Sequence, residues 1–379
     1  MMCGITGIFN GDLSTLSSAN SLISHRGPDD DGIYVNHVLN IGLGHRRLSI
    51  LDTSSFGHQP MCSNNGKTIL VFNGEIYNYK ELRSDLKRKG FAFQGKSDTE
   101  VLLNLYLSEG KEMLSKLNGI FAFAIFDTSS ESLFLARDAL GVKPLYYSNQ
   151  DNVFAFSSEI KALLKLTLNN KELDAESINR YLSFLWCPGD GTPLKSVKKL
   201  LPGEAIIVKN GCITDKWLWY KLPILNNIKK SLGKDQAISG VTKYLKQAVH
   251  RQMVADVPLG AFLSGGLDSS AVVAFAKEVN PDIRCFSIET KGKQDRGVVD
   301  DLPYAKRVAK HLNVSLDVVS IESYRMASDL ESMIAQLDEP LADPAALNVL
   351  YISQLAREQG IKVLLSGAGG DDLFTGYRR

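Results

Sequence analysis

The spacing of apolar residues changes near residue 236, and this change is the strongest constraint on what the chain can fold into. Beyond that point, short apolar runs such as Val257–Leu263 alternate with stretches of helical spacing such as 269–279. Short buried strands separated by helices are typical of a parallel, doubly wound sheet. Such sheets bind ligands beyond the carboxyl ends of their strands. The second half is therefore predicted to be an α/β domain with its site at that edge.

The two halves have different predicted element orders. The second half is predicted to contain helix 236–254, strand Val257–Leu263, helix 269–279, strand Arg284–Glu289, helix 301–312, strand Val314–Ser320, two helical stretches and strand Ile361–Leu365. In the first half, glycine turns separate short predicted strands from one another and from two predicted helices. The strands are Gly4–Phe9, Ile69–Phe72, Phe121–Asp127, Ser132–Arg137, Leu145–Tyr147 and Val153–Ser157, and the helices are Tyr79–Lys89 and Thr99–Glu109. This mixture predicts an α+β domain. A hairpin-like segment ends near Trp217–Tyr220, and a polar linker follows it.

Length and composition limit the class of protein. A chain of 379 residues exceeds the usual size of one core, which favours two domains. Lys plus Arg (43) nearly balance Asp plus Glu (42), so neither nucleic acid nor a membrane surface is an expected partner. No apolar run spans a bilayer and no signal peptide is present, which favours a cytoplasmic protein. Five scattered cysteines favour reduced thiols over a zinc site or a disulfide framework.

A thiol lies at the start of the chain, in Cys3-Gly4-Ile5. If Met1 and Met2 are removed, Cys3 carries its own base, because an α-amine has a pKa of about 7.7–8.0 and a thiol one of about 8.5. Taken alone, this residue is more simply a small buried cysteine.

The residues that follow Cys3 change that interpretation. They are His25-Arg26-Gly27-Pro28-Asp29, His45-Arg46-Arg47-Leu48-Ser49-Ile50, Gln59-Pro60, Asn73-Gly74-Glu75-Ile76-Tyr77-Asn78, Ser97-Asp98-Thr99-Glu100, Arg137-Asp138, Lys143-Pro144-Leu145-Tyr146-Tyr147 and Ser158-Glu159-Ile160-Lys161. In this order they resemble the N-terminal-nucleophile (class II) glutaminase domain of the asparagine synthetase family. The resemblance covers the whole first domain.

The resemblance implies a role for each of several residues. Cys3 is the nucleophile that attacks the side-chain amide of glutamine. Arg47 grips the carboxylate of glutamine, as a planar guanidinium can, and Glu75 with Asp98 hold its ammonium. The Asn73 side-chain amide and the Gly74 backbone N–H stabilise the oxyanion.

Each of these residues also has a simpler structural interpretation. Asn73-Gly74 is a common hairpin turn signal. Arg47 fits a solvated surface, and Asp98 fits the N-cap of a helix starting at Thr99, with or without a binding role. Arg26 and His45 are interpreted as structural supports.

A glycine loop follows the first strand of the second half. Val257–Leu263 runs into Ser264-Gly265-Gly266-Leu267-Asp268-Ser269-Ser270 and then into a helix. Backbone N–H groups of the loop, the helix start and the hydroxyls of Ser264, Ser269 and Ser270 suit an anion, and Asp268 suits Mg²⁺. The lysine of a Walker loop is absent. The sequence resembles the SGGxDS loop of ATP pyrophosphatases, which release AMP and pyrophosphate.

The last predicted strand leads into a second loop, Ser366-Gly367-Ala368-Gly369-Gly370-Asp371-Asp372. By resemblance, Ser366 and Gly367 bind phosphate, Asp371 binds Mg²⁺, and Ser287 with Ile288 contact adenosine. Asp338-Glu339-Pro340 and Asp343-Pro344 also match the family, although both also fit structural turns.

The resemblance therefore predicts an αββα N-terminal-nucleophile hydrolase sandwich at 3–220, a linker at 221–235 and an ATP-pyrophosphatase domain at 236–379. The implied reaction uses L-glutamine, ATP and Mg²⁺ to amidate a carboxylate, with L-aspartate as the first candidate acceptor. Family members usually carry glutamate where this chain has Ala368. A sugar carboxylate of surface-polysaccharide synthesis is therefore an alternative acceptor. A glutamine-sensing remnant is an alternative of another class.

Two expectations concern the molecule as a whole. A homodimer is a possible assembly. Family members extend well beyond the second loop, so the synthetase domain is expected to be incomplete at Arg379 and the isolated chain to act mainly as a glutaminase.

Overall fold

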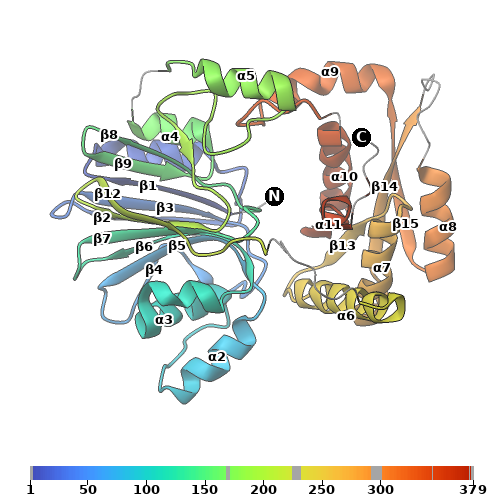
Figure 1. Cartoon of the computed structure of the whole chain (residues 1–379), viewed down its shortest axis with the longest axis horizontal. Helices are drawn as coiled ribbons and strands as arrows, with labels where there is room; N and C mark the ends of the chain where they lie inside the picture. The colour runs from blue at the N-terminus through green and yellow to red at the C-terminus, as the bar shows by residue number, and fades with distance from the viewer. Residues whose placement is uncertain are drawn as a thin grey trace. The chain divides into compact units, whose positions relative to one another are not determined.

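The structure is a computed structural model that describes residues 3–167, 171–223, 232–291, 301–343, 345–374 and 376. The chain divides into two compact units (Figure 1). The first contains Met1–Ile224 together with Asp338–Ala342, and the second contains Leu225–Leu337 together with Asp343–Arg379. Part of the predicted linker, 224–231, lies outside the described residues.

Two antiparallel sheets form the centre of the first unit. The first sheet has the order β10 (Lys198–Lys199), β8 (Tyr146–Gln150), β9 (Val153–Ser157), β1 (Gly4–Phe9), β3 (Ile41–Arg47) and β2 (Asp30–Asn36). The second has the order β12 (Cys212–Leu218), β11 (Glu204–Lys209), β7 (Ser132–Arg137), β6 (Gly119–Asp127), β5 (Thr68–Ile76) and β4 (Met61–Cys62). Their facing surfaces enclose a core of buried aliphatic and aromatic side chains.

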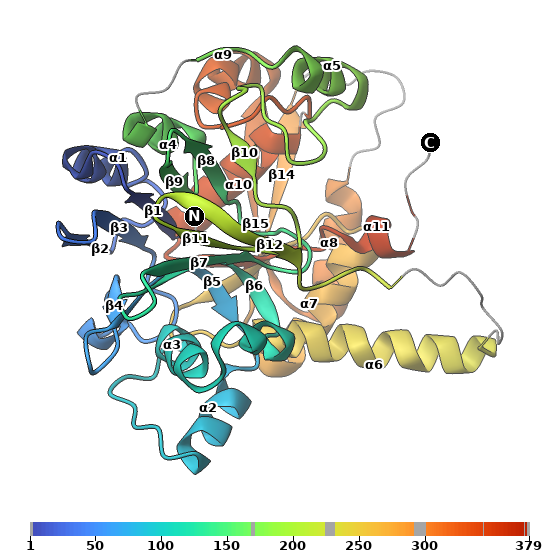
Figure 2. The ribbon, with the colours of Figure 1, turned by 60° about the vertical axis from the view of Figure 1, so that its left-hand side comes forward.

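Helices cover the outer surfaces of both sheets (Figure 2). The helices of this unit are η1 (Leu13–Thr15), α1 (Leu16–Leu22), η2 (Ser55–Gly57), α2 (Tyr79–Arg88), α3 (Asp98–Glu109), η3 (Gly110–Lys116), α4 (Ile160–Thr167) and α5 (Ala175–Phe184). α1 and α4 pack on the first sheet through Leu16, Ala19 and Leu163, which cluster with Ile8 of β1. On the second sheet, Tyr106 of α3 stacks on Phe134 of β7, with 5.9 Å between the ring centroids. The predicted αββα sandwich is confirmed.

The ladder between β5 and β6 carries three of the predicted site residues, Asn73, Gly74 and Glu75. It pairs nine residues of β5 with nine of β6, from Thr68 opposite Asp127 to Ile76 opposite Gly119. Because side chains alternate along a strand, Asn73 and Glu75 lie on the same face of β5. The strand extends beyond the predicted Ile69–Phe72, since the pairing continues through Asn73 and Gly74.

The second unit contains a parallel sheet of order β15 (Ser315–Glu322), β14 (Arg284–Lys291), β13 (Leu259–Phe262) and β16 (Val363–Leu365). Its helices are α6 (Lys234–Gln252), α7 (Leu267–Val279), α8 (Leu302–Leu312), α9 (Ser323–Ile334), α10 (Ala345–Glu358) and α11 (Gly370–Phe374). Alternation along β14 sends Cys285 into the cluster with α6, α7 and α8, and Phe286 into the cluster with α10. The sheet is therefore covered on both faces, which confirms the predicted doubly wound class.

The sequence patterns missed several elements of the first unit. β2, β3, α1, α4 and α5 were not predicted. Glycine and polar positions interrupt the apolar residues of β2 and β3, and the three helices have only 7, 8 and 10 residues. Within the part of the chain that the structure describes, every helix is too short or too polar to cross a bilayer.

Candidate functional site

Cys3 lies directly before β1, and its sulfur is held against the strand end of β3. The backbone N–H of Leu48 donates to Sγ at 3.3 Å, and the thiol faces the Leu48 carbonyl at 3.6 Å. Burial raises the pKa of the Cys3 thiol, while the Leu48 N–H and the charges of Lys143 and Arg47 act in the opposite direction. A thiol in this setting needs a nearby proton acceptor before it can attack.

Arg26 fixes the backbone of Cys3, and the buried carboxylate of Glu159 holds Arg26 in place. The Arg26 Nε–H donates to the Cys3 carbonyl oxygen at 3.0 Å, and Arg26 Nη1 pairs with Glu159 Oε1 at 2.8 Å. His25 Nε2 lies 2.8 Å from the same Glu159 oxygen, and Lys161 Nζ lies 2.8 Å from the other without forming a well-directed hydrogen bond. Burial alone would raise the pKa of Glu159, but these neighbours outweigh it and hold the pKa below its usual range.

Asn73 provides a side-chain amide that has no partner within the described part of the chain. The side chain is 1% exposed, and neither its nitrogen nor its oxygen hydrogen-bonds to any residue that the structure describes. Such a buried amide costs about 1–3 kcal/mol relative to a paired one. A methyl group at the adjacent Gly74 would lie 2.3 Å from the Ile120 carbonyl oxygen, so glycine is required there. An oxyanion is a suitable partner for the Asn73 amide.

Two buried carboxyl groups lie beside this strand. Asp98 is 4% exposed and accepts the Ile76 backbone N–H at 2.9 Å. Burial raises its pKa to about 6, although the Ile76 hydrogen bond acts against the shift. Burial, followed by the charge of Asp98, raises the pKa of Glu75 to about 7, and Lys143 partly offsets this. A second cation, such as a ligand ammonium, would stabilise both carboxylates.

Arg47 is buried and its guanidinium is fixed by the following loop. It is 6% exposed and donates to the carbonyl oxygens of Ser54 at 3.1 Å, Leu51 at 3.3 Å and Asp52. Gly57 leaves room for it, since any side chain there would overlap Nη2. These contacts use three of the five N–H donors of the guanidinium, so the loop fixes the group and leaves two donors for other partners.

The first glycine loop of the second unit joins β13 to α7. Ser264 Oγ lies 3.0 Å from Ser269 Oγ and accepts the Gly266 N–H at 3.3 Å, while Ser270 Oγ donates to the Gly266 carbonyl at 2.7 Å. Gly265 has φ +84°, and a methyl group there would lie 2.3 Å from the Ala305 backbone nitrogen. The loop therefore depends on glycine for both its conformation and its packing.

The second loop, after β16, packs against the first. A methyl group at Gly367 would lie 2.7 Å from the Ser269 nitrogen, and one at Gly370 would lie 2.3 Å from the carboxyl carbon of Asp268. Asp268 therefore lies against the residue that precedes Asp371. Two carboxylates plus substrate phosphate oxygens suit Mg²⁺, which seldom needs a full set of protein ligands. Among the described residues, no three potential metal-binding side chains gather in one place.

The edge of the sheet places a third segment beside these loops. Phe262, the last residue of β13, pairs with Phe286. Ser287 and Ile288 of β14 therefore lie beside the residues that lead from β13 into the first loop. Ser287 is buried and Ile288 is partly exposed. Their position agrees with the site expected at the carboxyl ends of parallel strands.

Comparison with known proteins gives the family. Residues 2–219 match the glutamine amidotransferase domain family, and residues 240–379 match asparagine synthase. Putative asparagine synthetase [glutamine-hydrolyzing] 2 of Methanocaldococcus jannaschii is 36% identical over 99% of this chain and 76% of its own length. The chain belongs to the glutamine-hydrolysing asparagine synthetase family.

Other relatives differ in length from this family member. Asparagine synthetase [glutamine-hydrolyzing] 1 of Bacillus subtilis is 38% identical over 99% of this chain, which spans 59% of that relative. Amidase chry2 of Gibberella zeae is 30% identical over 99% of this chain and 59% of its own length. The solved B. subtilis glutamine phosphoribosylpyrophosphate amidotransferase covers 100% of this chain and 94% of its own, at 16% identity and a TM-score of 0.45. That last similarity is too low to add to the family assignment.

The structure corrects three of the simpler interpretations of this asparagine synthetase-family site. Asn73-Gly74 is not a hairpin turn, because both residues pair within the β5–β6 ladder. Arg47 is not on the surface. Asp98 is not the N-cap of α3, because Ser97 accepts the Glu100 N–H in that role and Asp98 is the first helical residue.

Sequence reasoning gave no role to two buried charged residues of the same family site. Lys143 is 8% exposed, and its charge acts on both Cys3 and Glu75. Glu159 supports Arg26 and thereby Cys3. Both residues were in the matched motifs, but their position depends on segments more than a hundred residues away from Cys3. For Lys143, its position between Val142 and Pro144 was the available signal, whereas Glu159 follows the polar Ser158 and gave no such signal.

Proposed function

We propose that this chain is a glutamine-dependent asparagine synthetase: it hydrolyses glutamine to glutamate and ammonia, and transfers the ammonia to an ATP-activated carboxylate. The names of the curated relatives support this reaction, and L-aspartate is the first candidate acceptor. The observation that supports it most directly is the buried amide of Asn73, which has no partner among the described residues and lies on the same strand face as Glu75. Domain bounds of 3–220, 221–235 and 236–379 are part of the proposal.

In the first reaction, Cys3 Sγ attacks the side-chain amide carbon of glutamine. The α-amine of Cys3, once Met1 and Met2 are removed, accepts the thiol proton and later protonates the departing ammonia. The oxyanion of the tetrahedral intermediate receives hydrogen bonds from the Asn73 amide and the Gly74 N–H. Loss of ammonia leaves a glutamyl thioester, which water hydrolyses to glutamate.

Glutamine is held by its backbone groups. The fixed guanidinium of Arg47 binds the α-carboxylate. The ammonium binds Glu75 and Asp98, which are both buried, and the charge of Asp98 adds to burial in raising the pKa of Glu75. Binding of this cation favours the ionised form of both carboxyl groups, so the site is matched to an amino acid.

In the second reaction, a carboxylate oxygen of the acceptor attacks the α-phosphorus of ATP and pyrophosphate leaves. Ammonia then attacks the acyl carbon, and AMP leaves. The N–H groups and hydroxyls of Ser264–Ser270 and of Ser366 and Gly367 hold the phosphates, and Ser287 with Ile288 contact the adenosine. Asp268 and Asp371 would hold Mg²⁺, which when bound neutralises phosphate charge.

The variant Cys3→Ala separates the two reactions. We expect loss of glutamine hydrolysis with ammonia-dependent pyrophosphate release retained, because different units carry the two sites. Asp268→Asn and Asp371→Asn are expected to give the opposite pattern, and Asp372→Asn is the matched control. Loss of both activities in Cys3→Ala would contradict the division of labour.

The acceptor is a separate question, and Ala368 is the observation that favours a second candidate. Ala368 is exposed within the second loop, at the position where family members usually carry glutamate. A screen of pyrophosphate release with ammonia across aspartate and uronic acids decides between aspartate and a sugar carboxylate. Ala368→Glu is expected to shift the relative rates toward aspartate. Absence of glutamine hydrolysis in the parent protein would favour a glutamine-sensing remnant.

The proposal extends to the surroundings of the enzyme. We place the reaction in the cytoplasm, where glutamine, ATP and reduced thiols coexist, and propose a homodimer as the assembly. Fractionation of the producing cells and sedimentation of the purified chain test these two statements.

A further inference from the structure

A short acidic segment links the two halves of the sequence. Asp338–Ala342 lies in sequence between α9 and α10, which are helices of the second unit, yet it packs as part of the first unit. Two of its residues form specific hydrogen bonds there: Glu339 and Ala342, whose N–H donates to the Leu185 carbonyl at 2.9 Å. The segment is therefore fixed at both ends.

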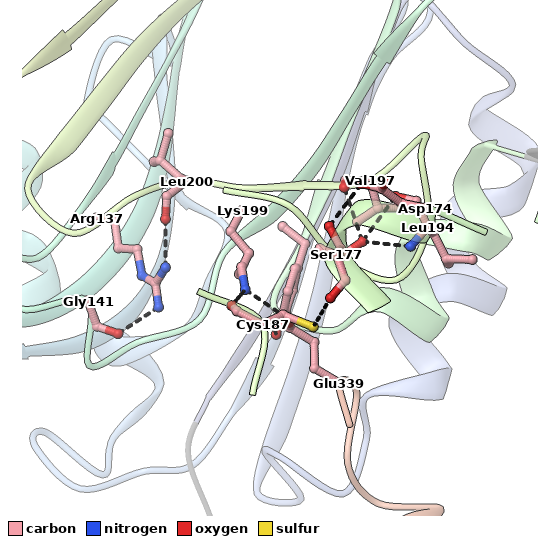
Figure 3. A network of polar contacts seen from close by, with 12 residues as sticks. Arg137, Gly141, Asp174, Ser177, Cys187, Leu194, Val197, Lys199, Leu200 and Glu339 are labelled. Carbon is pink, nitrogen blue, oxygen red and sulfur yellow. Dashed lines mark hydrogen bonds and ion pairs between the residues drawn. The ribbon is translucent and has the colours of Figure 1, made fainter. Parts of the chain in front are cut away.

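Glu339 is paired in a nearly closed environment. One carboxylate oxygen accepts the Tyr146 hydroxyl at 2.8 Å, and the other pairs with Lys199 Nζ at 2.8 Å. Figure 3 shows the Lys199 amine between Glu339 and the Cys187 carbonyl, to which it also donates. The side chains of Lys199 and Glu339 are 11% and 18% exposed. Without Glu339, the Lys199 ammonium would lose its carboxylate while still shielded from water.

The pairing register connects this ion pair to the strand of the nucleophile. Lys199 lies opposite Tyr146, Tyr146 opposite Ser157, and Ser157 opposite Thr6 of β1. The four residues form one continuous row across the first sheet. Ser157 Oγ also accepts the backbone N–H of Glu159 at 3.2 Å. Two residues, Tyr146 and Ser157, therefore connect Glu339 to the backbone of Glu159.

Asp338 also interacts with Glu159, independently of Glu339. Burial, followed by the charge of Glu159, raises the pKa of the Asp338 carboxyl to about 6. The charge of Lys161 and the backbone N–H groups of Ile160 and Lys161 at the start of α4 act in the opposite direction. Glu159 binds Arg26, and Arg26 holds the Cys3 carbonyl. Both acids of the segment are thus connected to Glu159, which pairs with the Arg26 that holds the Cys3 carbonyl.

We propose that Asp338 and Glu339 are positioning residues for Cys3, so that a segment from the synthetase half of the sequence sets the rate of glutamine hydrolysis. The inference rests on the proposed glutaminase activity of Cys3. Neither acid touches glutamine, and each acts through Glu159 and Arg26. The glutaminase site is complete only when 338–342 is seated.

The test uses the full chain and three variants. Glu339→Gln removes the charge at constant size, Asp338→Asn removes the charge of the carboxyl that interacts with Glu159, and Tyr146→Phe removes only the hydroxyl bound to Glu339. Glu331→Gln, on an exposed position of α9, is the matched control. Two quantities are measured: kcat and KM for glutamine hydrolysis, and the rate of Cys3 alkylation by iodoacetamide with exposed Cys62 as internal reference.

We expect Glu339→Gln and Asp338→Asn to lower kcat about tenfold with KM within about twofold, as for a misplaced reacting group. The Cys3-to-Cys62 alkylation ratio should change about threefold, with a smaller change in Tyr146→Phe and none in Glu331→Gln. Parent-like kcat and alkylation ratio in Glu339→Gln, or in Tyr146→Phe if Glu339→Gln does not fold, would overturn the inference. If the parent does not hydrolyse glutamine, the proposed function fails, and the alkylation ratio still decides this inference.

Discussion

The Arg26 guanidinium donates to the Cys3 carbonyl oxygen at 3.0 Å, so a side chain, rather than a strand ladder alone, fixes the backbone of the proposed nucleophile. The same group pairs with Glu159 at 2.8 Å. Cys3 precedes β1, and its neighbour Gly4 is the first residue of that strand to pair with β3, opposite Arg46. The orientation of the thiol therefore depends on a group that one point substitution can remove.

The variant Arg26→Lys tests this dependence. A lysine ammonium cannot serve the Cys3 carbonyl and Glu159 with the fork geometry of arginine, and we expect kcat for glutamine hydrolysis to fall about 10- to 100-fold. Arg46→Lys is the matched control, because Arg46 donates to Asn20 and Ser21 on α1. Steady-state ammonia release measures both, and equal rates in the two variants would contradict the assignment.

The variant Asn73→Ala should separate catalysis from stability. We expect a loss of about 100-fold or more in kcat, because one oxyanion donor disappears, and little loss of thermal stability, because the amide has no partner among the described residues. Asn78→Ala should behave in the opposite way. Asn78 donates to the Lys116 carbonyl at 2.9 Å and accepts the Asn118 N–H at 3.0 Å. Melting curves and glutamate release distinguish the two variants.

The pKa of Glu75 predicts a pH-dependent stability difference. Its folded pKa of about 7 exceeds the usual value of 4.5, mainly because of burial and then Asp98. The neutral carboxyl stabilises the fold fully below about pH 4.3, and this contribution is lost as pH rises through about 7. Glu75→Gln cannot ionise, so its Tm relative to the parent should be higher by a few degrees at pH 8 than at pH 5.

Exposed Glu131 provides the control for the titration of Glu75. The Tm difference between Glu131→Gln and the parent should change little over the same pH interval. A Tm difference for Glu75→Gln that is constant between pH 5 and pH 8 would show that Glu75 keeps an ordinary pKa in the folded protein.

Gly265→Ala tests the first glycine loop of the second unit. Its φ of +84° and the predicted overlap with the Ala305 nitrogen make a side chain costly. We expect ATP-dependent pyrophosphate release to be lost while glutamine hydrolysis stays near the parent rate. Gly240→Ala, within α6, should preserve both activities, because a methyl group there meets no atom within 4 Å. Full pyrophosphate release from Gly265→Ala would remove the loop from the proposed ATP site.

Local patterns predicted the second unit better than the first. The glycine loop at Ser264–Ser270 follows directly from a strand, a glycine pair and a helix, and all three are contiguous in sequence. The parallel sheet was also predictable, because each buried strand is a short apolar run between helices. The roles of the Ser264–Ser270 loop toward ATP and Mg²⁺ stay predictions.

The glutaminase side depends on contacts between distant segments. Asn73-Gly74 has the composition of a turn, and only the pairing with β6 places it inside a strand. Glu159 and Lys143 become relevant because the chain returns to Cys3 after more than a hundred residues. No periodicity encodes such a return, so the family resemblance, rather than spacing, drew attention to these motifs.

The excursion of 338–342 into the first unit means that the chain passes between the two units three times, near 224, 337 and 342. A single proteolytic cut in the linker would therefore not release an intact N-terminal fragment. Such a fragment would lack the carboxylate that neutralises Lys199. Gene fragments that end near residue 220 are accordingly poor starting points for transplanting this glutaminase onto another enzyme, unless residues 338–342 are supplied as a tethered peptide.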